Sequence, residues 1–442
     1  MQYLPNILFV LLLICGIGFF IKNVGRLRRN ILLGKDVDVS DEKPVRWRNM
    51  VKIALGQTKM VVRPVPGILH IIVYVGFIII NIEVLEIIVD GILGSHRIFA
   101  GAGKLYDVLI GSFEILALLV VIAVIIFWIR RNLIRLQRFI KPEMQGWPKK
   151  DGNLILYIEL VLMMLFLTMN AADFQLQQLG SEHYVQAGSF PVSAYLGAFF
   201  EGMSESNLII LERTAWWLHI SGILFFLNYL YYSKHLHILL AFPNTYYGKV
   251  TPKGQFKNLE AVTNEVKLMM DPSVDPFAAP AEEDISEPGK FGASDVRDLN
   301  WVQLLNSYTC TECGRCTSEC PANQTGKKLS PRKIMMDTRD RLEEVGKNID
   351  SNKGTFKEDG KQLLDNYITR EELWACTSCN ACVEACPVSI DPLSIIMDMR
   401  QYLVMEQSAA PSDLNNMMAN IENNGAPWPF NQMDRLNWSQ ES

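Results

Sequence analysis

Eight of the nine cysteines fall into two runs that share one spacing. Each run reads Cys-x2-Cys-x2-Cys-x3-Cys-Pro, and the runs occupy residues 310–321 and 376–387. Cysteine thiolates at this spacing bind iron–sulfur clusters, and the fourth cysteine of each run reaches across to the other cluster. The pattern therefore predicts a protein that carries single electrons.

Two [4Fe–4S] clusters follow from this crossed pattern. The first cluster is expected to bind Cys310, Cys313, Cys316 and Cys386. The second cluster is expected to bind Cys376, Cys379, Cys382 and Cys320. Structural zinc is the alternative, but zinc needs four ligands and has no use for the third short step and the final Cys-Pro. Disulfides are disfavoured because cysteines this close in sequence suit a metal better.

The composition separates the chain into two unlike halves. Of the 442 residues, 49% are hydrophobic, and the formal net charge is −5. Long apolar runs dominate residues 1–245, and one of them contains Cys15, which we expect to be a buried thiol. Residues 250–442 have the polar composition of a soluble domain. Lys and Arg form no basic stripe, so no nucleic-acid partner is expected.

Five apolar runs are long enough to cross the hydrocarbon core of a membrane as helices of about 20 residues. They lie near residues 3–22, 67–90, 106–129, 154–176 and 214–233. The first run is interpreted as a helix and not as a signal peptide, because it has no positive charge before it and no Ala-x-Ala site.

The loops between these runs predict the orientation. Lys and Arg number eleven in residues 22–66 and seven in 130–153, against two in 91–105 and one in 177–213. Because positive loops stay on the cytoplasmic side, the N-terminus is expected outside and the cysteine runs in the cytoplasm. A reducing compartment also suits thiolate-bound iron.

Histidines in the apolar half are candidates for haem ligation. His70 lies near the cytoplasmic end of the second run, while His219 and His237 differ in depth by about 27 Å along the fifth. His70 can therefore share a level with His235 or His237 but not with His219. Two neutral imidazoles that face each other across a helix bundle would hold a b-type haem. For His235 a lipid-headgroup contact is the favoured interpretation, and His96 and His183 are interpreted as surface residues.

Two stretches carry a family resemblance. PGILHIIVYVGF and WLHISGILFFLNYLYYSKHLHILLAFPN resemble the gamma subunit of respiratory nitrate reductase and the membrane cytochrome of heterodisulfide reductase. The resemblance implies that His70 and His237 hold the inner haem. The nitrate reductase cytochrome has a second histidine where this chain has Ile80. Three roles therefore stay open for His219: ligand of a second haem, hydrogen-bond donor to a quinone, or packing residue.

Further polar residues gather toward the predicted outer face: Glu83, Glu86, Asp90, Glu114, Asp173 and Arg213. We expect them at the headgroup boundary, where charge costs little. The alternative is a water-linked site that takes protons from a quinol.

The polar half is expected to begin with a linker at 246–293 and to continue as a helical domain at 294–410. Ser294 or Asp295 should cap its first helix, and Ser330 and Thr369 should cap later ones. With 55 residues between the cysteine runs, it resembles the helical ferredoxins of succinate dehydrogenase and of heterodisulfide reductase. The tail at 411–442 is expected either to dock on a partner or to pack on its own domain.

The predicted fold class is all-α: a five-helix transmembrane cytochrome b bundle at 1–245, followed by a cytoplasmic dicluster ferredoxin domain. The whole chain resembles a fusion of the membrane cytochrome of heterodisulfide reductase with the helical ferredoxin of the same enzyme. The function predicted is electron transfer among menaquinone or ubiquinone, one b-type haem, the clusters and a cytoplasmic cysteine-rich oxidoreductase. No catalytic residue is assigned, because no substrate site is evident. A membrane-tethered iron–sulfur redox sensor is the alternative.

Overall fold

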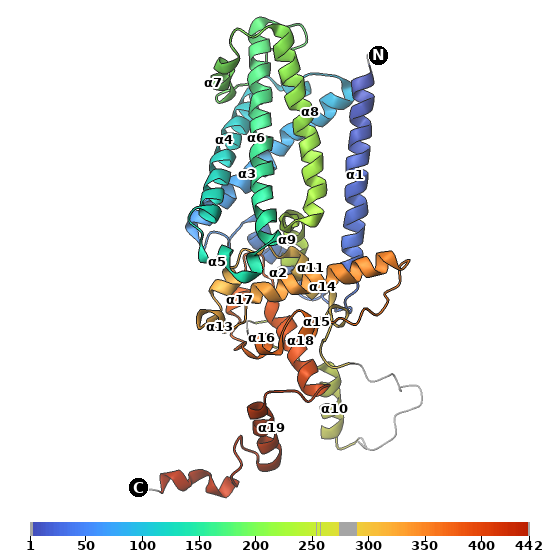
Figure 1. Ribbon diagram of the computed structural model, residues 1–442, viewed down its shortest axis with the longest axis vertical. Coiled ribbons are helices and arrows are strands. Elements are labelled where there is room, and N and C mark those ends of the chain that lie inside the picture. Colours follow the sequence, from blue (N-terminus) through green and yellow to red (C-terminus); the bar gives the residue numbers. More distant parts are fainter. Residues whose placement is uncertain (1–2, 253, 257, 274–289, 441–442) are drawn as a thin grey trace.

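The computed structural model describes residues 3–252, 254–256, 258–273 and 290–440. Every regular element in those residues is a helix, and they form a long bundle that stands on a smaller helical part (Figure 1). The all-α class is therefore confirmed for the residues described. We call the end of the bundle that meets the smaller part the near end, and the opposite end the far end.

Five helices are long and apolar enough to cross a membrane in the described part of the chain. They are α1 Leu4–Ile31, α3 Pro64–Leu93, α4 Lys104–Asn132, α6 Trp147–Leu179 and α8 Glu205–Tyr229. Each of the five apolar runs predicted from sequence overlaps one of them, and the fifth run continues past the end of α8 into η5. The helices extend beyond most of the runs because their polar ends continue the same hydrogen-bonded turns.

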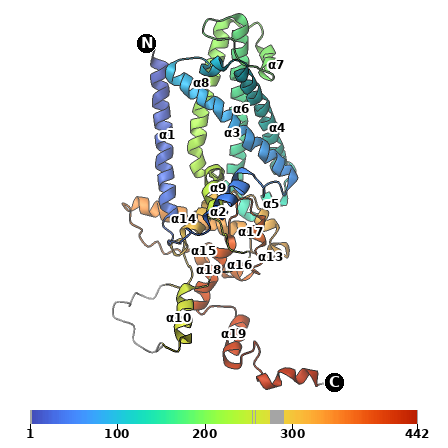
Figure 2. The same cartoon turned by 180° about the vertical axis from the view of Figure 1, so that it is seen from behind.

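The bundle is built around α6, which packs against both α4 and α8. Helix α3 crosses obliquely and packs on α4, whereas α1 packs on α3 and α8 (Figures 1 and 2). Phe9, Phe113, Phe166 and Trp216 belong to the buried core between these helices. Cys15 of α1 is exposed, so the expectation of a buried thiol is wrong; it lies on a face of α1 that no other helix covers.

Short helices lie between the long ones or follow the last of them. Before α6 these are α2 Lys43–Met50, the π-helical turn η1 Val51–Leu55, η2 Ile98–Ala102, α5 Gln137–Ile140 and η3 Pro142–Met144. After α6 they are α7 Ser193–Gly197, η4 Ala198–Phe200, η5 Leu230–Tyr232, η6 Lys234–Leu236, α9 His237–Tyr246 and α10 Glu260–Met270. Three segments lie at the near end, where they meet the cysteine runs (Figure 1). They are the chain between η1 and the start of α3, the helix α5, and the chain from η6 through α9.

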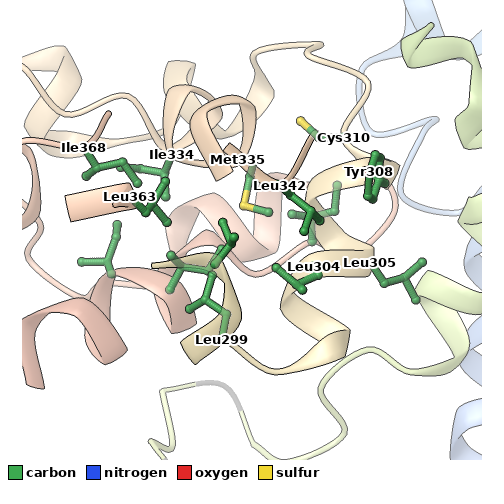
Figure 3. Close-up of a cluster of buried hydrophobic side chains, with 14 of the residues drawn as sticks. Leu299, Leu304, Leu305, Tyr308, Cys310, Ile334, Met335, Leu342, Leu363 and Ile368 are labelled. Atoms are coloured by element: carbon green, nitrogen blue, oxygen red, sulfur yellow. The ribbon is translucent and has the colours of Figure 1, made fainter. Parts of the chain in front are cut away.

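The smaller part contains both cysteine runs. Its helices are η8 Val296–Asp298, α11 Trp301–Thr309, α12 Arg315–Ser318, α13 Pro321–Gln324, α14 Pro331–Ser351, α15 Leu363–Asn366, α16 Arg370–Trp374, α17 Ala381–Ala385 and α18 Pro392–Met405. Its core is a cluster of aliphatic side chains that includes Leu304, Ile334 and Leu342, with Cys310 at the edge (Figure 3).

Side-chain caps explain where several of these helices begin. Ser330 accepts a hydrogen bond from the N–H of Lys333, and Thr369 forms a reciprocal capping box with Glu372, as the sequence predicts. The helix expected to start at Ser294 or Asp295 is instead split. Asp295 caps the short η8, and Asn300 opens α11 with a capping box of its own.

The bundle and the smaller part share buried contacts. Leu27 and Ile31 of α1 and Leu230 of η5 belong to the same apolar cluster as the core of the cysteine-bearing part. Asn30 donates a hydrogen bond to the hydroxyl of Tyr308 at 3.0 Å. The near end therefore holds the cysteine runs in a fixed relation to the membrane helices.

The predicted linker and tail flank this unit. Residues 274–289, within the predicted linker at 246–293, lie outside the described residues. The tail forms α19 Ser412–Asn424 and η9 Gln432–Ser439, and it extends away from the rest of the chain (Figures 1 and 2). Its side chains Phe430, Met433 and Trp438 are exposed, so the described tail does not bury them on its own domain.

Candidate functional site

The thiols predicted to hold the first cluster surround one pocket. Cys310, Cys313 and Cys316 line it together with Cys386, which comes from the second run. The helices α12 and α17, each of which lies within one run, pack against each other and bring the distant cysteine into place. Cys382 of the second run also reaches this pocket.

The thiols predicted to hold the second cluster also lie near one another. Cys376 is close enough to Cys320 and Cys379 for their charges to interact, and Cys382 is close to Cys376 and Cys320. The fourth cysteine of the first run thus lies among the first three of the second run. The fold brings both crossed quartets together, and of the eight thiols Cys379 is the exposed one.

A four-iron cubane keeps its cysteine ligands further apart than a single ion does, because irons and sulfides lie between them. Thiols placed around a pocket are compatible with that requirement.

Backbone amides point at several of the sulfur atoms. The N–H of Ser378 donates to Sγ of Cys376 at 3.4 Å. The sulfur atoms of Cys310, Cys382 and Cys386 also receive backbone hydrogen bonds, from the amides of Glu312, Val383, Val388 and Ile390. Hydrogen bonds to sulfur favour added negative charge and so tune the reduction potential of a cluster.

Equivalent positions in the two runs share a left-handed backbone conformation. Gly314 and Asn380, each directly after the second cysteine of its run, have φ angles of +72° and +61°. Asn tolerates this left-handed conformation better than most side chains. A Cβ at position 314 would lie 2.5 Å from Nη1 of Arg332 and 3.2 Å from Cβ of Arg138. The first run therefore leaves little room for a side chain at this position unless Arg332 shifts, while the second run carries one.

His70 and His237 face each other at the near end of the bundle. Their ring centroids are 6.4 Å apart, and the rings are inclined by 43°. Two imidazoles on opposite sides of one iron, each with its nitrogen about 2 Å from the metal, also have ring centres about 6 Å apart. The spacing of this pair therefore fits a haem with two histidine ligands.

The hydrogen bonds of these rings also fit ligation. Nδ1 of His237 is 3.1 Å from the carbonyl oxygen of Lys234, which can only accept, so Nδ1 carries the proton and Nε2 is left as a ligand. Nδ1 of His70 is buried without a hydrogen-bond partner among the described residues. A buried, unsatisfied nitrogen costs free energy unless another group binds it.

His70 lies in α3, and His237 is the first residue of α9, which follows α8 through η5 and η6. Helix α3 packs on α1 and α4, and α8 packs on α1 and α6.

His219, the third predicted ligand, lies deeper in the bundle. It is buried, and its Nδ1 is 3.0 Å from the carbonyl oxygen of Leu162, which again leaves Nε2 free. The ring contact that the structure gives it is with Phe166, at 5.9 Å between centroids. Ile80, at the position of the expected partner, is a buried aliphatic side chain of the core.

His235 does not point toward lipid headgroups, contrary to the expectation from the sequence. Its Nε2 lies 3.5 Å from Oε1 of Glu159 on α6, and its ring packs against Phe226 and His237. The short η6 turns the chain back under the bundle and so carries His235 inward. A carboxylate and a third imidazole thus lie beside the His70–His237 pair.

One ion pair joins the histidine segment to the first cysteine run. Nζ of Lys234, three residues before His237, pairs with the carboxylate of Glu312, which lies between Cys310 and Cys313. Glu312 is also bound by Arg339 at 2.9 Å. Burial alone would raise the pKa of Glu312, but these two cations hold it below its usual range.

Further contacts join the first cysteine run to the segment that precedes the His70 helix. Arg315, between Cys313 and Cys316, donates to the carbonyl oxygen of Lys59 at 3.0 Å. Arg63, directly before α3, binds Glu319 at 2.7 Å. The segment that leads into the His70 helix therefore rests on the first cysteine run.

A cavity of about 450 Å³ opens at the far end of the bundle. Glu83, Glu86 and Asp173 line it and are buried between the helices. Glu114 is also buried, and its carboxylate accepts the backbone N–H groups of Val192 and Ser193. The sequence does not show that these carboxylates point into the bundle. The polar residues of α3 and α6 are few among apolar ones and mark no regular helical face.

Arg97 organises this cavity, and no signal in the sequence marked it. Its guanidinium binds Asp173 at 2.6 Å, Asn170 at 2.9 Å and the hydroxyl of Tyr106 at 3.1 Å. His96, interpreted as a surface residue, lies 3.2 Å from the other oxygen of Asp173. Oε2 of Glu83 is buried with no hydrogen-bond partner among the described residues.

Comparison with known proteins identifies the cysteine-bearing part. Residues 309–390 match the family described as "4Fe-4S dicluster domain". No solved structure matches the chain. Matches to iron–sulfur components of heterodisulfide reductases from Methanosarcina and Archaeoglobus confirm the resemblance for this part. The resemblance of the bundle to membrane cytochromes stays a prediction.

Two matches extend over most of the chain, and a third is shorter. The "Probable iron-sulfur-binding oxidoreductase FadF" of Bacillus subtilis is 28% identical over 427 residues, which cover 90% of this chain and 54% of that protein. The "EtfAB:quinone oxidoreductase" of Syntrophomonas wolfei is 24% identical over 436 residues, which cover 93% and 56%. The "Probable membrane-anchored ferredoxin" of Chromohalobacter salexigens is 32% identical over 167 residues, which cover 34% and 24%.

The chain spans about half the length of the first two relatives. The cysteine-bearing part, the five apolar helices and these relatives agree on the general role. The chain is an iron–sulfur protein of electron transfer, and it has the helices of a membrane protein.

Proposed function

We propose that the chain is a membrane-bound subunit that relays electrons between a quinone, one b-type haem, two [4Fe–4S] clusters and a soluble redox partner. One observation carries this proposal: both crossed thiol quartets lie in the part that meets the near end of the bundle, and the Lys234–Glu312 ion pair joins the segment of His237 to the first of them. A relay requires such closeness, and a sensor confined to the soluble part does not.

The geometry described above supports the following assignment of cofactor ligands. The first cluster is held by Cys310, Cys313, Cys316 and Cys386, and the second by Cys376, Cys379, Cys382 and Cys320. His70 and His237 hold the haem, and their own hydrogen bonds keep Nε2 of His237 available. The haem and the clusters supply one-electron chemistry. We assign His219 a role at the deeper level of the bundle and no second haem.

The far-end cavity is the proposed quinone site. A quinol that is oxidised releases two protons with its two electrons, so its site needs groups that accept protons and lead to water. Glu83 offers a buried carboxylate oxygen that has no hydrogen-bond partner among the described residues. From Glu83, protons can pass by way of Asp173 and His96 toward the far-end loop. Trp216 and Phe9 provide apolar walls for a quinone ring. The name of the Syntrophomonas relative supports a quinone as the membrane substrate.

The orientation proposed from the charged loops places the near end and the clusters in the cytoplasm. The partner is a cysteine-rich oxidoreductase that resembles the catalytic component of heterodisulfide reductase, or the corresponding half of a longer chain. Cys379 is exposed, so electrons exchange with this partner most directly through the second cluster. The functional units are taken as residues 1–245 and 294–410.

Membranes that contain the chain test the proposal. Menaquinol or ubiquinol is added under anaerobic conditions. The b-type haem and the clusters should both become reduced, which the haem absorption band and the cluster signals in electron paramagnetic resonance report. Glu83→Gln should slow this reduction, while the amounts of haem and cluster stay unchanged. A haem band that responds neither to quinol nor to the partner would contradict the quinone link.

A further inference from the structure

Three arginines converge on an open pocket of about 470 Å³ at the near end of the bundle. Arg63 precedes α3, Arg130 lies in the last turn of α4, and Arg138 belongs to α5. The rest of the lining is apolar or uncharged: Val62, Pro64, Val65, Pro66, Leu136 and Gln137. No carboxylate among the described residues lines this pocket, which we call the arginine pocket.

The charge in the arginine pocket is only partly compensated. Arg63 has an anionic partner, Glu319. Within the described residues, the side chains of Arg130 and Arg138 form no ion pair, and Nε of Arg138 is buried without a hydrogen-bond partner. Arg138 instead lies over the ring of Phe139, at 4.8 Å from its centroid. The pocket therefore holds a surplus of at least one positive charge.

Several other buried arginines of this chain pair with carboxylates, whereas Arg130 and Arg138 form no ion pair among the described residues. Arg97 binds Asp173 at 2.6 Å, and Arg332 binds Glu143 at 2.6 Å. Burial lowers the pKa of Arg138 to about 10; Cys313 opposes this effect, while nearby guanidinium groups including that of Arg63 add to it. A half-buried guanidinium near other cations and without a carboxylate partner is costly.

The surroundings of the pocket are apolar. Its lining comes from the start of α3, the last turn of α4 and α5, which lie at the near end of the bundle (Figures 1 and 2). Val62 and Val65 of the rim are exposed, as are Leu133 and Ile134 directly after α4. A ligand here would meet cationic groups at one end and hydrocarbon at the other.

We propose that the arginine pocket binds the headgroup of an anionic phospholipid in the near leaflet. The phosphate supplies the missing negative charge to Arg130 and Arg138, because guanidinium groups pair with phosphate in a bidentate manner. The acyl chains lie along the exposed apolar side chains at the ends of α3 and α4. Basic pockets between membrane helices on the cytoplasmic side bind such headgroups. This site requires the helices to span a bilayer, but it does not depend on a haem or a quinone.

The pocket is joined to the first cysteine run. The carbonyl oxygen of Arg138 accepts a hydrogen bond from Nη1 of Arg332 at 2.6 Å. The same guanidinium lies against Gly314, between Cys313 and Arg315. A lipid that orders α5 therefore also orders the wall of the first thiol pocket, and its removal should loosen the cluster held there.

The test compares lipids and variants on the purified full chain in neutral detergent. The chain is delipidated and then titrated with cardiolipin, phosphatidylcholine or inorganic phosphate, and binding is followed by native mass spectrometry and thermal unfolding. We expect cardiolipin to bind and to raise the unfolding temperature, and phosphatidylcholine and phosphate to do neither. Full stabilisation by inorganic phosphate alone would assign the pocket to a free anion and overturn the lipid proposal.

Variants assign the effect to the pocket. Arg130→Gln should weaken cardiolipin binding about tenfold, the effect of losing one charge-assisted contact. Arg135→Gln is the matched control, because Arg135 is exposed in the same segment and does not line the pocket. Equal losses of cardiolipin affinity in the two variants would show that the binding depends on general surface charge, and they would contradict the proposal.

A second variant separates lipid binding from a role beside the cluster. Arg138→Gln should weaken cardiolipin binding as Arg130→Gln does. If Arg138→Gln binds cardiolipin as tightly as the unaltered chain and shifts only the potential of the first cluster, Arg138 is a counter-charge to that cluster and the proposal fails. Lipid selectivity of the unaltered chain tests the proposal even if a variant does not fold.

Discussion

Lys234 and Glu312 form a buried ion pair between the segment that carries His237 and the loop between Cys310 and Cys313. They are separated by 78 positions in the chain. The carbonyl oxygen of Lys234 is also the acceptor for Nδ1 of His237. One residue thus orients a predicted haem ligand with its backbone and the first cysteine run with its side chain.

Substitutions of this pair should shift the potential of the first cluster in opposite directions. Lys234→Met removes a positive charge, so it should lower the potential, whereas Glu312→Gln removes a negative charge and should raise it. Redox titration followed by electron paramagnetic resonance measures both. Lys234→Arg should stay near the unaltered value. Shifts of the same sign in the Met and Gln variants would show that the pair acts through structure and not through charge.

The crossed pattern of ligands predicts which double substitutions are additive. Cys386→Ser should remove the first cluster, so adding Cys310→Ser should cost no further iron. Cys386→Ser with Cys376→Ser should instead remove both clusters, because the two residues belong to different quartets. Non-haem iron and acid-labile sulfide per chain measure the outcome. Equal iron in the two double variants would mean that the quartets are assigned wrongly.

The equivalent positions 314 and 380 should tolerate substitution unequally. Asn380→Gly keeps a left-handed residue and should leave cluster content unchanged. Gly314→Asn places a side chain within the space of Arg332 and should lower the content of the first cluster, even though Asn suits the backbone. Iron analysis and the resonance signal of the first cluster compare the two variants. A normal Gly314→Asn protein would show that Arg332 moves aside without cost.

Arg332 should be important for stability as well as for the pocket. It is completely buried and binds Glu143 at 2.6 Å and the carbonyl oxygen of Arg138. Arg332→Met leaves the carboxylate of Glu143 without its cation, which should cost about 3–5 kcal/mol. Adding Glu143→Gln should recover part of that loss. Chemical unfolding of the full chain in detergent provides the free energies, and a loss below about 1 kcal/mol would contradict the role assigned to the pair.

The histidines should separate by haem content. His70→Ala and His237→Ala should lose the haem while the clusters remain, because each removes one of two axial ligands. His219→Ala should keep it, since its ring packs on Phe166 and faces no second imidazole in the contacts described. His235→Ala is the neighbouring control. Loss of haem from the control and not from His237→Ala would assign the ligand to the wrong histidine of that segment.

Local sequence signals predict the elements and the thiol groups better than the polar interior. Five long apolar runs, the caps at Ser330 and Thr369 and the repeated cysteine spacing are each encoded in adjacent residues. The split between η8 and α11 escapes prediction because Asn300 caps as well as Asp295 does, and only packing decides between them. The far-end cavity escapes it because Arg97 meets Asp173 and Asn170 from 73 to 76 positions away.

The composition of the purified chain tests the central claim most directly. Chemical analysis of iron and sulfide, combined with the pyridine haemochrome assay, counts the clusters and the haem per polypeptide. We expect about eight non-haem irons and about one b-type haem for each chain. A chain that contains no porphyrin, or about four non-haem irons, would contradict the proposed relay.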